Sequence, residues 1–261
     1  MDQTQSLISQ TGKTPAILGT TIGCIGSVED GVTLSNQWLA KGGIVMVNLW
    51  ATDPVTGLDD NDRNVDFGQM STPGTPLYNT WMAYLDTIAA KLKAINGPVL
   101  FRPFVELNGN WSWFGGKDPA QFIKVYQQMH DYLVITKGVH NLVWVYSIND
   151  GNGNYTAYYP GADYIDVVGM DAYPAQDYTK GMYNAALTLN KPMIFAEVGV
   201  ISPSPSPASF TGNNETMLQF IEADFPAVVA VVIWSQGWSL ATQNGASAVM
   251  NDQEVITLAD L

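Results

Sequence analysis

The chain has 261 residues, of which 46% are hydrophobic and 11% aromatic. This length suits one domain, residues 1–261, because single α/β barrels commonly reach it. The formal net charge is −13, and an acidic surface repels nucleic acid and anionic membranes. A neutral partner is therefore favoured, and the eight Trp and twelve Tyr residues either fill the core or stack on the apolar faces of sugar rings.

Cysteine content and the apolar runs bound the class of protein further. Cys24 is the only cysteine, which excludes an intramolecular disulfide and a thiolate metal cluster. Residues 1–6 show no basic region followed by an apolar run, so they are not a secretory signal. The longest apolar runs are strand-sized, so we expect no membrane contact. We expect a secreted protein without its signal, with a cytoplasmic one as the alternative.

Short β-branched runs alternate with longer helical patterns along the chain, which is typical of parallel βα units. Most of these runs are continuously apolar, as in strands that are buried on both faces. The runs predict seven strands, at residues 15–20, 43–49, 98–104, 142–147, 164–170, 192–197 and 228–234.

Three helices are predicted between the strands. Apolar residues at helical spacing extend from Leu77 to Ile95 and stop before Gly97-Pro98. A second helix opens with Asp118 as N-cap, followed by Pro119, and ends at Gly138. The third covers residues 214–224.

Seven strands are one short of a closed eight-stranded barrel. The missing strand would precede residue 15, where residues 3–10 are better explained as the end of a helix. The first strand is therefore either upstream of this chain or replaced. An open barrel would expose two edges of unpaired backbone that something must cover.

Two segments have loop composition. Residues 51–76 carry a group of aspartates, for which a calcium loop is the alternative interpretation. The spacing lacks the Gly and terminal Glu of an EF-hand, so we expect no metal. The group comprises Asp53, Asp59, Asp60, Asp62 and Asp66. Residues 202–207 alternate Ser and Pro, which predicts a stiff extended connection.

Two glutamates directly follow apolar, strand-like runs. Glu106 ends the run from Pro98, and Glu197 ends the run from Pro192. Active residues of α/β barrels lie at the carboxyl ends of strands, although salt-bridged strand ends are the structural alternative. A facing carboxyl pair is what glycoside hydrolysis needs, separated by about 5–5.5 Å in retaining enzymes and about 6.5–9.5 Å in inverting ones. Arg102 shares the inward parity of Glu106, and its guanidinium beside Glu197 would keep that carboxylate ionised.

Residues 101–116 read Phe-Arg-Pro-Phe-Val-Glu-Leu-Asn-Gly-Asn-Trp-Ser-Trp-Phe-Gly-Gly. This segment resembles the acid/base motif of glycoside hydrolase family 26, the β-mannanase family of clan A. In that motif an Arg-Pro pair precedes the catalytic Glu, and Asn-Gly and a Trp-rich turn follow it. The likeness continues in order across roughly residues 10–260, at residues 38–45, 141–147, 159–173, 191–199 and 232–235.

The resemblance implies a (β/α)8 barrel enzyme that hydrolyses β-1,4-mannosidic bonds of mannan-type polysaccharides with retention, in endo fashion and without a cofactor. Glu106 would be the general acid/base and Glu197 the nucleophile. Arg102 would support Glu197, and Tyr173 would hydrogen-bond it. Asp171 is expected to fix local loop geometry.

The resemblance also assigns aromatic side chains to the substrate. Trp111 and Trp113 would line the leaving-group side, and Trp234 would form the floor beneath the sugar being cleaved. Trp50 stands where the family has the His of a Trp-His pair, so it would offer stacking in place of a hydrogen bond. We expect a β-linked polysaccharide or oligosaccharide as partner, and a monomer.

A second departure from the family pattern is Val105, where a His usually precedes the acid/base. The only histidines, His130 and His140, fall in a predicted helix and the following turn and are expected to be scaffold. Losing one such buried hydrogen bond is worth about 1–3 kcal/mol, enough to change the preferred sugar. A β-1,3-xylanase, a mixed-linkage β-glucanase and an inactive carbohydrate-binding barrel are therefore the alternatives.

Overall fold

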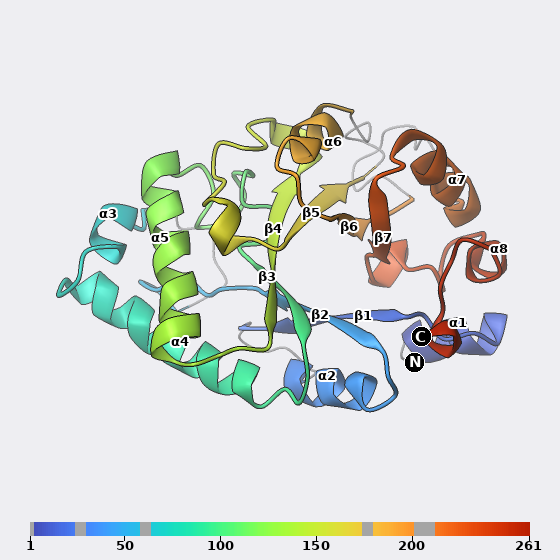
Figure 1. Ribbon diagram of the computed structural model, residues 1–261, viewed down its shortest axis with the longest axis horizontal. Helices are drawn as coiled ribbons and strands as arrows, with labels where there is room; N and C mark the ends of the chain where they lie inside the picture. The colour runs from blue at the N-terminus through green and yellow to red at the C-terminus, as the bar shows by residue number, and fades with distance from the viewer. Residues whose placement is uncertain (1–2, 24–29, 58–63, 174–179, 201–211) are drawn as a thin grey trace.

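The computed structural model describes residues 3–23, 30–57, 64–173, 180–200 and 212–261. Seven parallel strands form one sheet in chain order (Figure 1). They are β1 (Ile17–Ile22), β2 (Ile44–Leu49), β3 (Val99–Pro103), β4 (Leu142–Asn149), β5 (Val167–Ala172), β6 (Met193–Val198) and β7 (Val228–Ile233). All seven predicted strands are confirmed, with ends displaced by a few residues.

Helices connect the strands and lie outside them (Figure 1). The α-helices are α1 (Gln3–Thr11), α2 (Gly31–Leu39), α3 (Phe67–Met70), α4 (Pro76–Lys93), α5 (Pro119–Asp131), α6 (Lys180–Leu187), α7 (Asn214–Asp224) and α8 (Ala246–Met250). A π-helical turn η1 (Tyr132–Thr136) prolongs α5, and short 3-10 turns are η2 (Asp150–Asn152), η3 (Ala162–Tyr164), η5 (Gln236–Trp238) and η6 (Leu258–Asp260). None of the helices in the described ranges has the length and apolar character needed to span a bilayer.

The predicted helices α4, α5 and α7 are confirmed, with Asp118 accepting from the Gln121 amide as the N-cap of α5. Helix α2 was missed. Its buried residues are Gly31, Ser35 and Trp38, so its inner face is mostly small or polar and produces little hydrophobic periodicity.

The sheet is an incomplete barrel with β1 and β7 at its two edges. Among the described residues, no strand ladder joins these two edges. Residues 3–10, predicted as the end of a helix, belong to α1, whose Leu7 packs in one cluster with Val249 and Met250 of α8. Within the described ranges the structure is therefore an α/β barrel with seven strands, one short of eight.

The side chains that face the inside of the barrel form two layers. Successive residues of a strand point to opposite sides, so residues two apart share the interior. The lower layer is apolar and contains Met46, Val145, Val167, Ile194 and Ala196. The upper layer, nearer the carboxyl ends of the strands, is polar and contains Asn48, Arg102, Ser147, Asn149, Asp171 and Glu197.

An irregularity in the pairing of β5 with β6 places Glu197 in the upper layer. Met170 pairs with Phe195, but the next residue, Asp171, pairs with Glu197 rather than Ala196. A β-bulge inserts one extra residue in this way and re-aims the side chains that follow it. Ala196 and Glu197 consequently both face the interior, one in the apolar layer and the other beside Asp171.

An aromatic cluster anchors the segment that follows β3. Phe104 lies at its centre, and its ring centroid is 5.2 Å from that of Phe122, 6.1 Å from that of Tyr126 and 6.4 Å from that of Trp113. Trp113 is only 2% exposed, and its indole N–H donates to the carbonyl of Ala51 at 2.8 Å. The prediction that Trp113 lines the leaving-group side is therefore wrong, because the turn directs this ring into the core.

We expect Trp113→Ala to lower the free energy of unfolding by about 3–5 kcal/mol, because it leaves a cavity in a packed aromatic cluster. Urea unfolding followed by far-UV circular dichroism measures this loss. Trp50→Ala is the matched control, since Trp50 is 39% exposed and should lose little stability. Equal stability losses in the two variants would contradict the core role of Trp113.

Candidate active site

Glu106 lies in the turn after β3 rather than on the strand itself. Both Phe104 and Glu106 adopt left-handed backbone conformations, with φ of 51° and 54°. The turn is fixed to β4, because the Glu106 amide donates to Ser147 Oγ at 3.0 Å and the Leu107 amide donates to the Ser147 carbonyl at 3.1 Å. The backbone of Glu106 is therefore positioned by the neighbouring strand.

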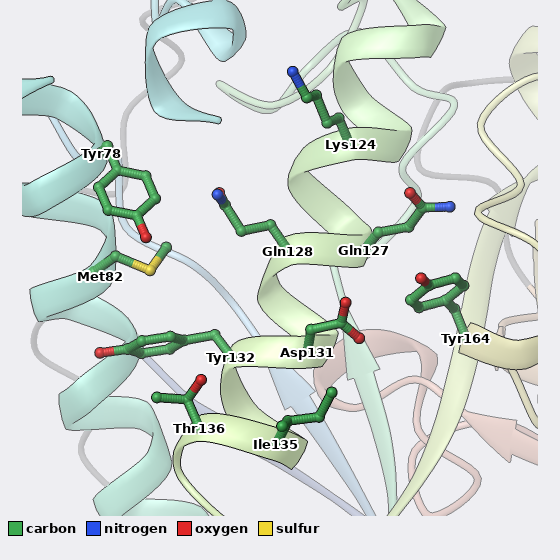
Figure 2. A pocket seen from close by; sticks show the side chains of 10 residues that line it. All are labelled: Tyr78, Met82, Lys124, Gln127, Gln128, Asp131, Tyr132, Ile135, Thr136 and Tyr164. Carbon is green, nitrogen blue, oxygen red and sulfur yellow. The ribbon is translucent and has the colours of Figure 1, made fainter. Parts of the chain in front are cut away.

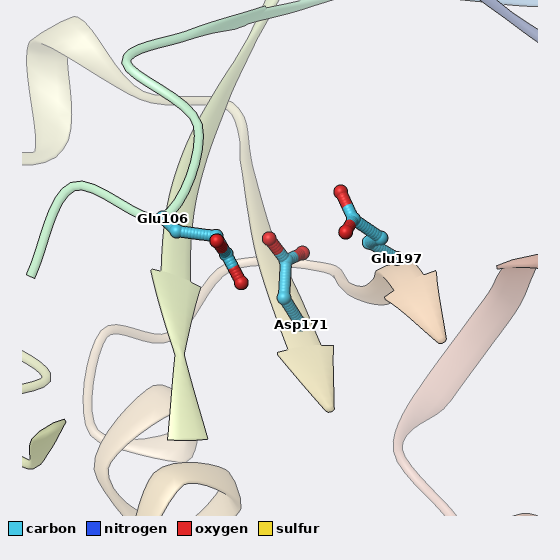
Figure 3. A group of neighbouring side chains, drawn as sticks. All are labelled: Glu106, Asp171 and Glu197. Atoms are coloured by element: carbon cyan, nitrogen blue, oxygen red, sulfur yellow. The ribbon is translucent and has the colours of Figure 1, made fainter. Parts of the chain in front are cut away.

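Three carboxyl groups converge at the carboxyl ends of the strands. One oxygen each of Glu106, Asp171 and Glu197 lies within 4.8 Å of the others, with Asp171 on β5 between the two glutamates (Figure 3). Such a group has the spacing to bind a metal ion. Arg102, however, already donates to Asp171 and Glu197, so a side chain supplies the positive charge that holds the group together.

The guanidinium of Arg102 is fully buried and directs its donors at four residues. Its Nε donates to Ser147 Oγ at 2.9 Å, and Nη1 donates to Asn48 Oδ1 and Glu197 Oε2, each at 3.1 Å. Nη2 forms an ion pair with Asp171. A buried guanidinium is costly unless its donors are used, and these contacts use them across five strands.

Glu197 receives two donors. Besides Arg102, the phenol of Tyr173 donates to Glu197 Oε1 at 2.7 Å. Both contacts agree with the predicted support of Glu197 by these residues. Glu197 is only 7% exposed, so its negative charge is stabilised by these fixed groups rather than by bulk water.

Glu106 has different surroundings. Trp111 donates its indole N–H to Glu106 Oε2 at 2.8 Å, and the Asn149 side chain donates to Oε1. Burial, together with repulsion from Glu197, raises the pKa of the Glu106 carboxyl from 4.5 to about 7, although Arg102, Asn149 and Trp111 act in the opposite direction. The two neighbouring carboxyls thus have different environments, and burial is the largest cause of the raised pKa of Glu106.

The family resemblance leads us to expect that Asp171 fixes local loop geometry, and this prediction is wrong. Asp171 lies inside β5 and has no exposed surface. Burial raises the pKa of its carboxyl, and the ion pair with Arg102 opposes this effect. Its register partners are Asn149 on β4 and Glu197 on β6. Asp171 therefore sets the orientation of Arg102 from the middle of the polar layer.

The other predicted aromatic residues stand at strand ends or in the turn after β3. Trp50 directly follows β2 and is 39% exposed, and Trp234 directly follows β7 and is half-buried. Trp111 lies over Gly109, where a Cβ would come within 2.5 Å of the indole. Glycine at position 109 therefore allows the Trp111 ring to reach Glu106.

The two histidines lie away from the carboxyl ends of the strands. His130 is on α5, outside the strands, and contacts the rings of Trp144 and Tyr164 at centroid distances of 4.7 and 4.9 Å. His140 is exposed just before β4 begins. Val105, which stands where the family pattern has a His before the Glu, is buried and offers no side-chain hydrogen bond.

Two predicted loop features fall partly on undescribed residues. Asp53 accepts from the amides of Val55 and Thr56, and Asp66 is the N-cap of α3, so both carboxylates act within their own turns. Residues 59, 60 and 62, the Ser-Pro segment 202–207 and Cys24 lie outside the described ranges.

A surface hollow of about 450 Å³ lies between α4 and α5 (Figure 2). None of the predicted site residues lines it. Its walls are formed by side chains of α4, α5, η1 and η3, namely Tyr78, Met82, Lys124, Gln127, Gln128, Asp131, Tyr132, Ile135, Thr136 and Tyr164.

Sequence reasoning missed three polar residues of the site: Asn48, Ser147 and Asn149. Each is buried near the carboxyl end of an apolar strand. The rule that identifies Glu106 and Glu197, a polar residue where an apolar run ends, would also have found them. Searching for acids alone excluded them.

Comparison with known proteins gives a consistent result. The model of glycosyl hydrolase family 26 matches residues 1–260. A mannan endo-1,4-beta-mannosidase of Bacillus subtilis (strain 168) is 28% identical over 285 residues, covering the whole chain and 77% of that protein. Another from Caldalkalibacillus mannanilyticus is 31% identical over 244 residues, covering 87% of the chain and 47% of that protein. A solved structure of a Bacillus subtilis mannanase superposes with a TM-score of 0.83 at 28% identity, covering 97% of this chain and 80% of the other.

The raised pKa of Glu106 predicts a pH-dependent stability. A carboxyl whose pKa is higher in the folded state stabilises the fold most below pH 4.5, and this stabilisation is lost as the pH rises through about 7. The Gln side chain of Glu106→Gln cannot ionise. As the pH rises from 5 to 8, we therefore expect the free energy of unfolding of this variant to increase relative to that of the unaltered protein by on the order of 1–3 kcal/mol.

Urea unfolding at the two pH values measures this gain. Glu254→Gln, which changes an exposed glutamate, is the control variant. A stability difference for Glu106→Gln that is the same at both pH values would contradict the raised pKa.

Proposed function

The chain belongs to glycosyl hydrolase family 26, and we propose on this basis that it is a retaining, endo-acting hydrolase of β-1,4-mannosidic bonds. In this proposal residues 1–261 form one catalytic domain that acts as a monomer on a β-linked polysaccharide. Such a polymer is too large to enter a cell, so we also propose that the enzyme works in secreted form.

The observation that carries the proposal is the pair Glu106 and Glu197. Their nearest oxygens lie within 4.8 Å, which supports a retaining mechanism, since inverting enzymes separate the carboxyls by about 6.5–9.5 Å. Glu106, with a pKa of about 7, holds a proton below neutral pH, as a general acid must. Glu197 is held by Arg102 and Tyr173, as suits a carboxylate that attacks.

The reaction then proceeds in two displacements. Glu197 attacks the anomeric carbon, the glycosidic C–O bond breaks, and Glu106 gives its proton to the departing oxygen. This step leaves a covalent glycosyl-enzyme. Glu106, now ionised, takes a proton from water as the water oxygen attacks the same carbon, which releases the sugar with its original configuration and restores Glu197.

Arg102 and Tyr173 support the nucleophile in different ways. Arg102 balances the charge of Glu197 while that charge is present, and part of this attraction is lost when the ester forms. The Tyr173 hydroxyl keeps Glu197 Oε1 in place, so that one oxygen remains oriented toward the sugar. We propose that both residues also lie beside the sugar being cleaved.

Three partly exposed tryptophans are the proposed sugar contacts. Trp111 is already hydrogen-bonded to Glu106, which supports a place on the leaving-group side. Trp234 would form the floor beneath the cleaved sugar, and Trp50 would stack on a neighbouring one. Aromatic rings suit this role because sugar rings have apolar faces.

The names of the relatives support mannan as the substrate, since both curated relatives above are mannan endo-1,4-beta-mannosidases. Val105 and Trp50 occupy positions where the family usually has histidine, and this difference keeps β-1,3-xylan and mixed-linkage β-glucan in the substrate panel. Release of reducing ends from each polymer measures the preference directly. Faster cleavage of either polymer than of mannan would replace the mannanase assignment.

We expect Glu197→Ala to reduce mannan hydrolysis by roughly 10⁴-fold or more, because the covalent intermediate cannot form. Calorimetric titration with a manno-oligosaccharide should show that binding is retained. Glu215→Ala, which removes an exposed glutamate on α7, is the control and should keep full activity. Substantial hydrolysis by Glu197→Ala would refute its role as nucleophile.

We expect Glu106→Ala to impair polymer hydrolysis far more than hydrolysis of activated aryl glycosides. The sugar alkoxide needs a proton in order to leave, whereas a nitrophenolate needs little help. The first-step rate, measured by pre-steady-state kinetics on both substrates, separates the two effects. Equal losses on both substrates would remove Glu106 from the acid/base role.

A further inference from the structure

Asn149 is the last residue of β4 and is 1% exposed. Its side-chain amide donates to Glu106 Oε1, although the two residues are 43 positions apart in the chain. Its register partner on β5 is Asp171, so it lies in the polar layer, and its side-chain oxygen caps the short turn η2. A buried amide at this place has a cost unless its polar groups are used, so the contact with Glu106 points to a function.

Hydrogen bonds elsewhere on Asn149 fix which end of its amide faces Glu106. Its Oδ1 accepts from the Gly151 amide at 2.6 Å, so the oxygen end of the side chain is occupied. The Asn108 side chain holds its backbone with two hydrogen bonds: it accepts from the Asn149 backbone N–H at 2.7 Å and donates to the Asn149 backbone carbonyl at 2.8 Å. If the side-chain amide were flipped, its NH2 group would face the Gly151 backbone N–H, and both are donors. The NH2 group of Asn149 therefore faces Glu106 and donates to it.

The second oxygen of Glu106 is held independently. Trp111 donates to Oε2 at 2.8 Å from the same turn that carries Glu106, whereas Asn149 approaches from β4. Two donors on different elements define the plane of the carboxyl group. This matters because Glu106 stands in a turn, and its side chain would otherwise have several rotatable bonds to order.

These donors also act on the charge of Glu106. Burial and the negative charge of Glu197 on β6 favour the neutral acid, whereas Arg102 on β3 and the two N–H donors favour the carboxylate. The balance leaves the pKa at about 7. A residue that acts first as acid and then as base requires a proton affinity near the working pH.

We propose that Asn149 is a positioning residue, which holds the carboxyl group of Glu106 in one orientation by donating its side-chain N–H to Oε1. Its side chain contacts the proposed acid/base, Glu106. The proposal deepens the proposed function and rests on it, because orientation of Glu106 matters only if Glu106 transfers protons.

The first test is a titration of Glu106 that needs no turnover. Carbon-13 labelling of glutamate carboxyls lets NMR follow each protonation, and the Glu106 signal is the one missing in Glu106→Gln. We expect Asn149→Ala to raise the midpoint of Glu106 by roughly one pH unit, because a donor to the ionised form is lost. Asn149→Asp keeps the size and the acceptor for Gly151 but adds a negative charge, so it should raise the midpoint further.

Asn152→Ala is the matched control, because Asn152 is an exposed amide in η2, just after β4. It should leave the midpoint and the activity unchanged. Thermal melting checks each variant, and Asn149→Asp carries the test if Asn149→Ala does not fold. An unchanged Glu106 midpoint in the folded Asn149 variants would overturn the proposal.

The second test is kinetic. At pH 6 we expect Asn149→Ala to lower kcat on mannan by roughly 10- to 100-fold with little change in KM, because the proton donor is misoriented while the sugar contacts remain. Activated aryl glycosides should be affected less, and the alkaline limb of kcat/KM should follow the NMR midpoint. A rise in KM alone would overturn the positioning role.

The two tests separate the proposal from the proposed function. A shifted Glu106 midpoint in a protein that cleaves none of the polymers supports the Asn149 contact and refutes hydrolysis. Hydrolysis by a protein whose Glu106 midpoint ignores Asn149 supports the function and overturns the positioning role.

Discussion

One buried guanidinium determines the arrangement of the site. Arg102 lies among three carboxyl groups and has no contact with solvent, so its charge must be balanced by side chains. Its partners come from β2, β4, β5 and β6, which ties the carboxyl ends of these strands to β3. Removing the Arg102 charge would leave the carboxylates of Asp171 and Glu197 buried without compensation. The strand ends and the charges therefore stabilise one another.

The two glutamates show how one fold gives chemically identical groups different properties. Glu197 is rigidly carried by a strand, and the bulge at Asp171 turns it toward Arg102. Glu106 is carried by a turn and receives neutral N–H donors. Glu197 is contacted by a full positive charge, whereas the described donors to Glu106 are neutral N–H groups. The two carboxyls therefore have different surroundings, as the two proposed roles require.

Sequence reasoning predicted the strands, the helices α4, α5 and α7, and the two glutamates, because burial on both faces produces continuous apolar runs and a polar residue at the end of such a run is conspicuous. It failed where the outcome depends on local backbone geometry. The ring of Trp113 is directed inward by a turn with left-handed residues, which no periodicity reveals. The bulge in β6 changes the parity of a single residue, and strand alternation cannot predict it.

The turn after β3 also connects Glu106 to the outer helices α4 and α5. Phe104 and Glu106, two residues apart, point to opposite sides of this turn. Phe104 packs against Trp81 of α4 and Phe122 of α5, whereas Glu106 faces the carboxyl groups of Asp171 and Glu197. Loosening of this helical shell would therefore displace Glu106, whereas Glu197 is carried by β6. Heat inactivation should consequently begin below the temperature at which the barrel melts.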